Sequence, residues 1–226
     1  MLAVVLYLVF AVAMASVVPP WETPDAPSHL MYIRYLYEVA HLPGPEQVWE
    51  GEGYPATLYE WHQVPFYYVF QSQVLRLRSL IGEVNFPSLD EGQSPAFSFV
   101  VPSARMHVPR WPWWGTERGY ESIFLLRLVN VLVFGLPCVV FAGWLGYQLT
   151  GDYDFAAMWA SSLALMPQFV FVQISIQNDA AAVLWATSAV GMLLTIPKLQ
   201  EKSADTRIAV RSEERRVGKE CRSRWS

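Results

Sequence analysis

Hydrophobic residues in this chain are concentrated in four long runs that are almost free of charged side chains. The runs are Leu2–Val18, Ile123–Leu149, Phe155–Ile176 and Ala180–Ile196. Each run is continuous rather than alternating, which is typical of membrane-spanning helices and not of barrel strands. A bilayer core about 30 Å thick requires about 20 apolar residues in helix, and lipid leaves every backbone group to be satisfied within the segment. We therefore expect four transmembrane helices.

The first run has a second interpretation as a cleaved signal peptide, because Ala13-Met14-Ala15 resembles a small-residue cleavage site. No Lys or Arg precedes this run, and three further apolar runs follow it. We therefore expect a retained helix. The missing basic residues also fit a true start upstream of Met1.

The predicted fold class is an all-α membrane protein with a long external loop bearing juxtamembrane helices. Lys198, Lys202 and Arg207 follow the last run, and basic residues flank spans on the cytoplasmic side. We therefore expect a multi-pass inner (plasma) membrane protein with a cytoplasmic N-terminus. The predicted organisation has spans at 1–18, 123–149, 155–176 and 180–196, an external loop at 19–122, a cytoplasmic segment at 197–210 and a separate tail at 211–226.

Composition supports this organisation. Charged residues make up 16% of the chain and hydrophobic residues 53%, whereas a soluble domain carries about 25% charged residues. The external loop has twelve acidic and six basic residues, which suits the outer face. A formal net charge of −4 gives no reason to expect a nucleic-acid partner.

The tail Arg211–Ser226 differs from the rest of the chain. Its sequence, RSEERRVGKECRSRWS, is rich in charge, lacks an amphipathic period and looks like a translated sequencing adapter. The alternative is a basic cytoplasmic tail that binds anionic lipid. If the tail is an artefact, Cys138 is the one remaining cysteine and is expected to be a packing residue. We interpret the chain as the front part of a longer enzyme.

The external loop is predicted to contain two helices. The first begins after Asp25, a plausible N-cap, and ends at Pro43. The second covers Pro65–Ile81, and its apolar stripe favours a position in the membrane interface. The Trp cluster at 110–114 marks a membrane–water boundary or, alternatively, a platform that stacks on sugars.

Several polar residues near the span ends are candidates for chemistry, and each has a structural alternative. Asp25 shares a helix face with His29, or merely caps the helix. Glu60 and His62 precede the second helix, where aromatic neighbours also fit an interfacial anchor. Arg127 lies one turn into the second span, where it is also placed to snorkel to the interface.

Asn178 and Asp179 form the turn between the third and fourth spans, on the same outer side as the external loop. Their structural alternative is a simple turn.

In combination, the motifs PDAPSH, EWHQVPFYY, RLVN and PQFVFVQISIQNDA resemble the membrane-embedded GT-C glycosyltransferases. The resemblance is greatest to predicted bacterial members related to protein O-mannosyltransferases and the lipid A aminoarabinose transferase. It extends from Pro19 to Ile196, with 82–119 resembling an insertion. The order and topological placement of the four motifs carry it.

The resemblance implies transfer of a sugar from a polyprenyl-phosphate donor to an acceptor hydroxyl at the outer membrane face. It implies that Asp25 is the general base. His29, His62 and Arg127 are then candidates to stabilise the lipid-phosphate leaving group. Asn178 and Asp179 would hold the acceptor, the sugar or a divalent cation, the one cofactor that the resemblance leaves open. Membrane lipid is the remaining expected partner, and Glu60 is a further candidate for binding substrate.

The chain departs from the family pattern at Ala26, where a second acid usually follows the aspartate. If that acid were the base, the protein would be impaired. A non-catalytic polytopic scaffold or a transporter component is therefore the alternative, although a transporter needs ionisable residues inside its spans.

Overall fold

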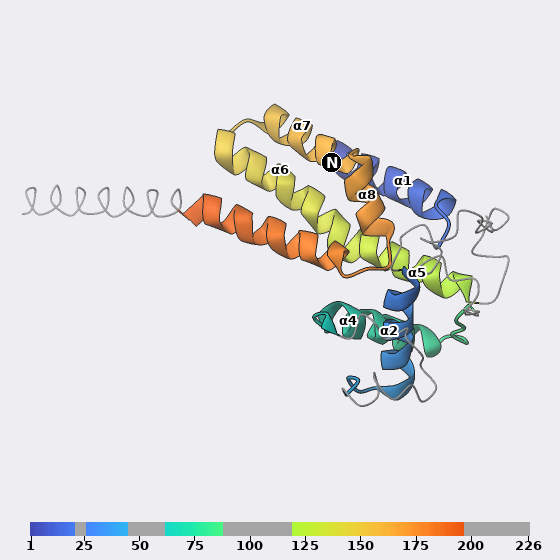
Figure 1. The fold of residues 1–226 in the computed structure, drawn as a ribbon. Coiled ribbons are helices and arrows are strands. Elements are labelled where there is room, and N and C mark those ends of the chain that lie inside the picture. The colour runs from blue at the N-terminus through green and yellow to red at the C-terminus, as the bar shows by residue number, and fades with distance from the viewer. Residues whose placement is uncertain (21–25, 45–61, 88–118, 197–226) are drawn as a thin grey trace, which may run out of the picture.

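The computed structural model describes residues 1–20, 26–44, 62–87 and 119–196. Within these ranges every regular element is helical, which agrees with the expected all-α class. A π-helical turn, η4 (Val131–Gly135), joins α5 to α6, and a last helix covers Asp179–Ile196. The α-helices in Figure 1 are α1 (Leu2–Val17), α2 (Ala26–Val39), α4 (Phe66–Ser79), α5 (Tyr120–Asn130), α6 (Leu136–Thr150), α7 (Tyr153–Ala164) and α8 (Pro167–Ile174).

The prediction of four spans is not confirmed. In the described part of the chain, two helices are long and apolar enough to cross a membrane, Tyr120–Thr150 with 31 residues and Asp179–Ile196 with 18. They contain the predicted spans 123–149 and 180–196. The first run forms α1, which is apolar but has 16 residues. At 1.5 Å per residue such a helix is about 24 Å long, shorter than a bilayer core of about 30 Å.

The predicted third span, 155–176, is broken. Its residues form α7 and α8, whose axes differ by 58°, so the pair counts as a span only if both helices cross together. The break lies at Met166, which has an extended backbone (ψ 112°) and precedes Pro167. A proline ring disfavours the α conformation for the residue before it, which explains the position of the bend.

The long helix from α5 to α6 contains the π turn η4 immediately before Leu136 and Pro137. Pro137 has no backbone N–H, and its ring needs room in the preceding turn. The Leu136 amide donates to the Val131 carbonyl, five residues back, so the turn is wider than an α-helical turn. The helix therefore continues past the proline without a break.

The apolar bundle is built around α1, α6, α7 and α8 (Figure 1). Small residues allow close contact: a Cβ on Gly146 would lie 3.1 Å from the Ala156 Cα. A Cβ on Gly135 would overlap the hydroxyl oxygen of Tyr7 in α1. Tyr7 also donates to the carbonyl of Val131 at 3.3 Å, so α1 is held directly against η4.

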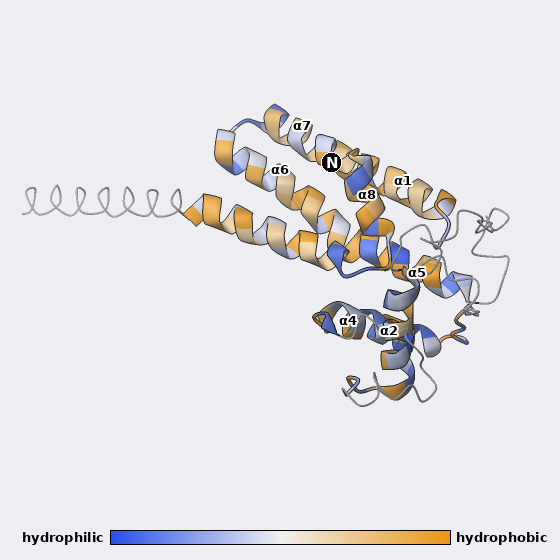
Figure 2. Cartoon of the chain, in the orientation of Figure 1, coloured by the Kyte–Doolittle hydropathy of each residue, from blue (hydrophilic) through white to orange (hydrophobic). Residues whose placement is uncertain are grey.

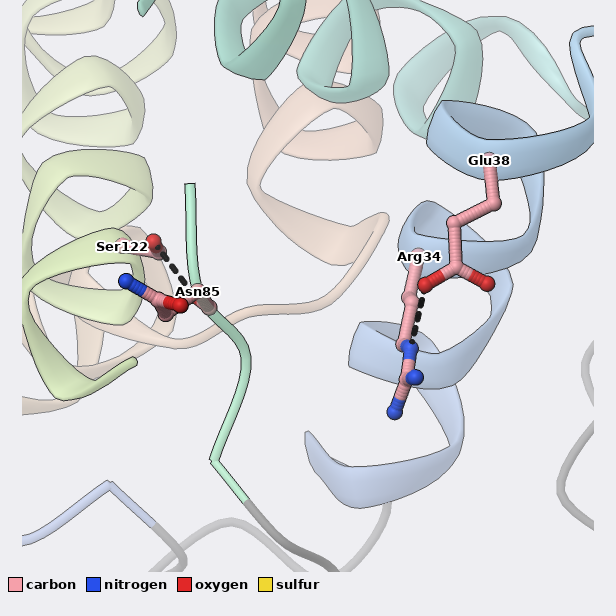
Figure 3. Close-up of polar contacts among 4 residues, drawn as sticks. All are labelled: Arg34, Glu38, Asn85 and Ser122. Atoms are coloured by element: carbon pink, nitrogen blue, oxygen red, sulfur yellow. Dashed lines mark hydrogen bonds and ion pairs between the residues drawn. The ribbon is translucent and has the colours of Figure 1, made fainter. Parts of the chain in front are cut away.

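A second core lies at one end of this bundle, where α2 and α4 pack on α5 and on the start of the last helix. Arg76 of α4 donates to the carbonyls of Leu36 and Tyr37, which are near the end of α2. Figure 3 shows the Ser122 hydroxyl of α5 donating to the carbonyl of Asn85, which ties the segment after α4 to the long helix.

The helix predicted at Pro65–Ile81 is present as α4, and its apolar stripe is largely uncovered. Phe66 is 51% exposed, Leu77 67% and Ile81 83%. The ring of Phe66 meets Trp185 of the last helix edge-on, at 6.0 Å between centroids. Figure 2 shows mixed hydropathy over α2 and α4 beside the predominantly apolar bundle helices. An apolar exposed face of this kind fits the expected position at the membrane surface.

Candidate functional site

His29 lies in the first turn of α2 and forms a hydrogen-bonded chain with α4. Its Nδ1 is 2.8 Å from the hydroxyl oxygen of Tyr68. The Tyr68 hydroxyl donates in turn to Oε1 of Gln63 at 2.6 Å. Both His29 and Tyr68 are buried, and the ring of Tyr32 covers Tyr68 at 4.3 Å between centroids. These two hydrogen bonds therefore connect the PDAPSH motif to the EWHQVPFYY motif.

A second set of hydrogen bonds is centred on Asn130, the last residue of α5. Its Nδ2 donates to the Tyr67 hydroxyl at 3.0 Å and to the carbonyl of Ser175 at 2.7 Å. Its Oδ1 accepts from Nε2 of Gln71. Asn130 and Gln71 are completely buried. One side chain thus joins α4, the long helix and the segment after α8.

Contact between Tyr67 and Tyr68 makes these two sets continuous. The two rings meet edge-on at 5.4 Å between centroids. Each of the four sequence motifs contributes to what we call the motif cluster, which consists of His29, Gln63, Tyr67, Tyr68, Gln71, Asn130 and Ser175. Residues from motifs far apart in the sequence therefore meet at the end of the bundle where α2 and α4 pack.

Burial affects the acidity of the tyrosines in and beside this cluster. Desolvation raises the pKa of Tyr67 well above 10, although hydrogen bonds from Asn130, from Gln71 and from the backbone of Gln177 oppose the shift. Desolvation also raises the pKa of Tyr32. Both phenols are therefore neutral at physiological pH and act as hydrogen-bonding groups.

Arg127 is buried, and its guanidinium contacts the backbone at the end of α1. Nη1 donates to the carbonyls of Ala15 and Val18 at 3.2 and 2.6 Å, and Nη2 donates to Pro19 at 2.8 Å. The final carbonyls of a helix have no partner within the helix and carry partial negative charge. Arg127 therefore caps α1, and its predicted role at a phosphate remains a prediction.

The structure places the other predicted residues as follows. Asp25 and Glu60 lie outside the described residues. His62 is exposed, just before α4. The Asn178 carbonyl accepts from the amides of Ala181 and Ala182 at 3.0 Å, so Asn178 is the capping residue directly before the last helix. Asp179 is exposed at the first position of that helix.

Five polar side chains of the motif cluster were missed as candidates: Gln63, Tyr67, Tyr68, Gln71 and Asn130. All except Gln71 lie within the quoted motifs, but the tyrosines fitted an interfacial anchor equally well. Asn130 gave a usable signal, because a carboxamide inside an apolar run requires a polar partner. Within the described ranges no three His, Cys, Asp or Glu side chains gather in a way that could hold a metal ion, and the divalent cation remains a prediction.

Comparison of the chain with known protein families, with curated proteins and with solved structures gives no match.

Proposed function

We propose that the chain belongs to a membrane glycosyltransferase, which transfers a sugar from a polyprenyl-phosphate donor to an acceptor hydroxyl at the outer membrane face. The observation that carries this proposal is the motif cluster. The resemblance rests on four short motifs, and hydrogen bonds and one ring contact join residues from all four. A shared site would explain why residues of all four motifs meet.

Asp25 is the proposed general base. It immediately precedes α2, and it lies four positions before His29, which belongs to the motif cluster. In the proposed step, Asp25 takes the proton of the acceptor hydroxyl as that oxygen forms a bond to the anomeric carbon. The bond from that carbon to the phosphate oxygen breaks, and its electron pair leaves with the lipid phosphate.

The phosphate requires a hydrogen-bond donor or a cation as negative charge develops on it. Among the candidates His29, His62 and Arg127, we assign this role to His29. His62 is exposed, and two nitrogens of Arg127 already donate to three carbonyls. Asn178 and Asp179 lie at the start of the last helix, three and four residues after Ser175, and are proposed to hold the acceptor or the sugar.

The membrane provides the second part of the proposal. A polyprenyl carrier keeps its sugar phosphate at the lipid surface, so the enzyme must work there. The exposed apolar face of α4 continues through the contact between Phe66 and Trp185 onto the last helix, which is apolar enough to cross a membrane. This continuous apolar surface supports a motif cluster at the edge of the bilayer, with α4 lying against the lipid.

Substitution of Asp25 by Asn tests the proposal. The variant removes the basic carboxylate and keeps the shape of the side chain. Sugar transfer from a labelled polyprenyl-phosphate donor, measured in membranes that contain the full-length protein, is expected to fall by about 10²–10⁴-fold, the usual contribution of a general base. A matched control is Glu38→Gln, which removes an acid of α2 that forms an exposed ion pair with Arg34 at 2.8 Å (Figure 3).

Undiminished transfer by Asp25→Asn would contradict the assignment of the base. A complete absence of transfer by the wild-type protein, across sugar donors, would favour the non-catalytic alternative of a scaffold or transporter component.

A further inference from the structure

We propose that Tyr68 and Gln63 fix the position of the proton on the His29 ring, so that Tyr68 is a positioning residue of the sugar-transfer site. The hydrogen-bond geometry stands by itself, whereas its catalytic consequence rests on the proposed function. The inference follows from the direction of two successive hydrogen bonds.

The direction is set at Gln63. Its Oε1 is a carbonyl oxygen and therefore only accepts hydrogen bonds. At 2.6 Å from this oxygen, the Tyr68 hydroxyl must donate its single proton to Gln63. The same hydroxyl oxygen lies 2.8 Å from His29 Nδ1, and because its proton goes to Gln63, it accepts in this contact. His29 must then carry a proton on Nδ1.

This arrangement decides which nitrogen of His29 is able to exchange a proton or to contact a ligand. In a neutral ring with its proton on Nδ1, Nε2 is the nitrogen that accepts a proton, and in a cationic ring it is the nitrogen that donates toward a ligand. A carboxylate or carbonyl that orients the far side of an imidazole has the same effect in metal sites. In the neutral ring, Nε2 takes up a proton from solvent. In the resulting cation, Nε2–H donates toward the departing lipid phosphate and stabilises its developing negative charge.

Packing around Tyr68 holds its hydrogen bonds to His29 and Gln63 in place. Tyr68 is completely buried and His29 is 3% exposed, so water does not compete strongly for the hydroxyl. Within the described part of the chain, the rings of Tyr32 of α2 and of Tyr67 also contact the Tyr68 ring. Burial raises the pKa of both phenols, so neither adds charge at physiological pH. The hydroxyl of Tyr68 is therefore kept in one orientation.

The test is ¹⁵N NMR of the imidazole nitrogens in histidine-labelled protein, reconstituted in lipid nanodiscs. The chain has four histidines, and loss of signals in His29→Gln identifies those of His29. At a pH where the ring is neutral, we expect a protonated Nδ1 and an unprotonated Nε2. Tyr68→Phe removes the acceptor and should produce a mixture of both tautomers.

Gln63→Glu retains an accepting oxygen and should preserve the wild-type pattern, whereas Gln63→Leu should lose it. The Gln63 variants also keep the test decisive if Tyr68→Phe fails to fold. The matched control is Tyr35→Phe, because the Tyr35 hydroxyl lies 3.5 Å from a different histidine, His41, and its loss should leave the His29 signals unchanged. A neutral wild-type ring with its proton on Nε2 would overturn the proposal. Nδ1 would then have to accept from Tyr68, so the hydrogen bonds between His29, Tyr68 and Gln63 would run in the opposite direction.

Sugar transfer provides the second readout. Tyr68→Phe is expected to lower kcat by about 10–100-fold, the usual effect of losing a group that orients a reacting side chain, with KM for the acceptor unchanged. If the NMR result holds and wild-type protein transfers no sugar, the positioning chain stands and the proposed function fails. If transfer is normal in Tyr68→Phe while the tautomer changes, the catalytic part of the inference fails.

Discussion

The side-chain amide of Asn130 donates a hydrogen bond of 2.7 Å to the backbone carbonyl of Ser175, 45 residues later in the chain. Through the same side chain, α4 is attached by Tyr67 and Gln71. Replacement by Leu would leave all three groups without this partner inside a buried site. We expect Asn130→Leu to lower the free energy of unfolding by about 2 kcal/mol or more.

Thermal unfolding in detergent measures this effect. The control is Ser162→Ala, whose exposed hydroxyl bonds only to the carbonyl of Met158 in its own helix. Unfolding of Asn130→Leu at the wild-type temperature would show that the amide contributes nothing to the joining of these segments.

The cap on α1 gives a second prediction. Without the Arg127 guanidinium, the carbonyls of Ala15, Val18 and Pro19 lose their charged donor. Arg127→Leu should cost about 3 kcal/mol, and Arg127→Lys somewhat less, because a single ammonium group replaces two donating nitrogens. Protease cleavage between residues 15 and 20 should become faster in both variants.

Arg34→Leu is the matched arginine control, since its partner Glu38 is at the surface and such pairs contribute about 0–1 kcal/mol. Wild-type stability of Arg127→Leu together with lost sugar transfer would instead place Arg127 in the site.

Gly135 tests the contact between α1 and η4. An added methyl group would overlap the Tyr7 hydroxyl, and overpacking of this kind costs about 1–3 kcal/mol. We expect Gly135→Ala to lower the unfolding temperature and the double variant with Tyr7→Leu to recover part of the loss. Gly82→Ala, which meets only the mobile end of the Arg78 side chain, is expected to be neutral. An equal loss with and without Tyr7 would exclude this clash as the cause.

Gln173 of α8 is completely buried, and neither atom of its amide has a hydrogen-bond partner within the described part of the chain. A buried amide without partners costs about 1–3 kcal/mol. Gln173→Met removes both polar atoms at a similar volume and should therefore raise the unfolding temperature. A lower temperature would mean that the amide is hydrogen-bonded in the membrane, and Gln177→Met, in the half-buried segment before the last helix, gives a comparison.

Alkaline pH should destabilise the motif cluster. The pKa of Tyr67 is raised above its ordinary value of 10.0 by burial, so the folded state holds the phenolic proton more tightly than the unfolded chain does. Stability is fully present below pH 10 and declines as the pH rises above it. Unfolding temperatures measured on both sides of pH 10 should show this decline. It should be smaller in Tyr67→Phe, and an unchanged decline in that variant would assign it to other tyrosines.

Sequence patterns predicted the elements whose causes are local. The apolar run at 123–149 lies inside the helix Tyr120–Thr150, and the stripe at Pro65–Ile81 lies over α4. The break at Met166 also had a local signal, Pro167, but hydropathy averaged over the run concealed it. A continuous apolar run therefore predicts that a segment is buried or faces lipid, but it does not predict that the segment forms one straight helix.

Contacts between distant segments were not predictable in the same way. Arg127 caps a helix that ends more than a hundred residues earlier, and no spacing within RLVN indicates those carbonyls. Tyr67 and Tyr68 are alike in sequence, yet one bonds to Asn130 and the other to His29. These partners depend on which helices pack together, and that is set by the three-dimensional arrangement.

The bond between Asn130 and Ser175 has a consequence for the order in which the protein is made. Chains emerge from the ribosome N-terminus first, so α2 and α4 leave before the residues that fasten them have been synthesised. Tyr67 of α4 cannot form its hydrogen bond before Asn130 has been synthesised, and Asn130 cannot bond to Ser175 before the segment after α8 has been synthesised. The helices α2 and α4 therefore reach their final place late, after the long helix and the segment after α8 have been synthesised.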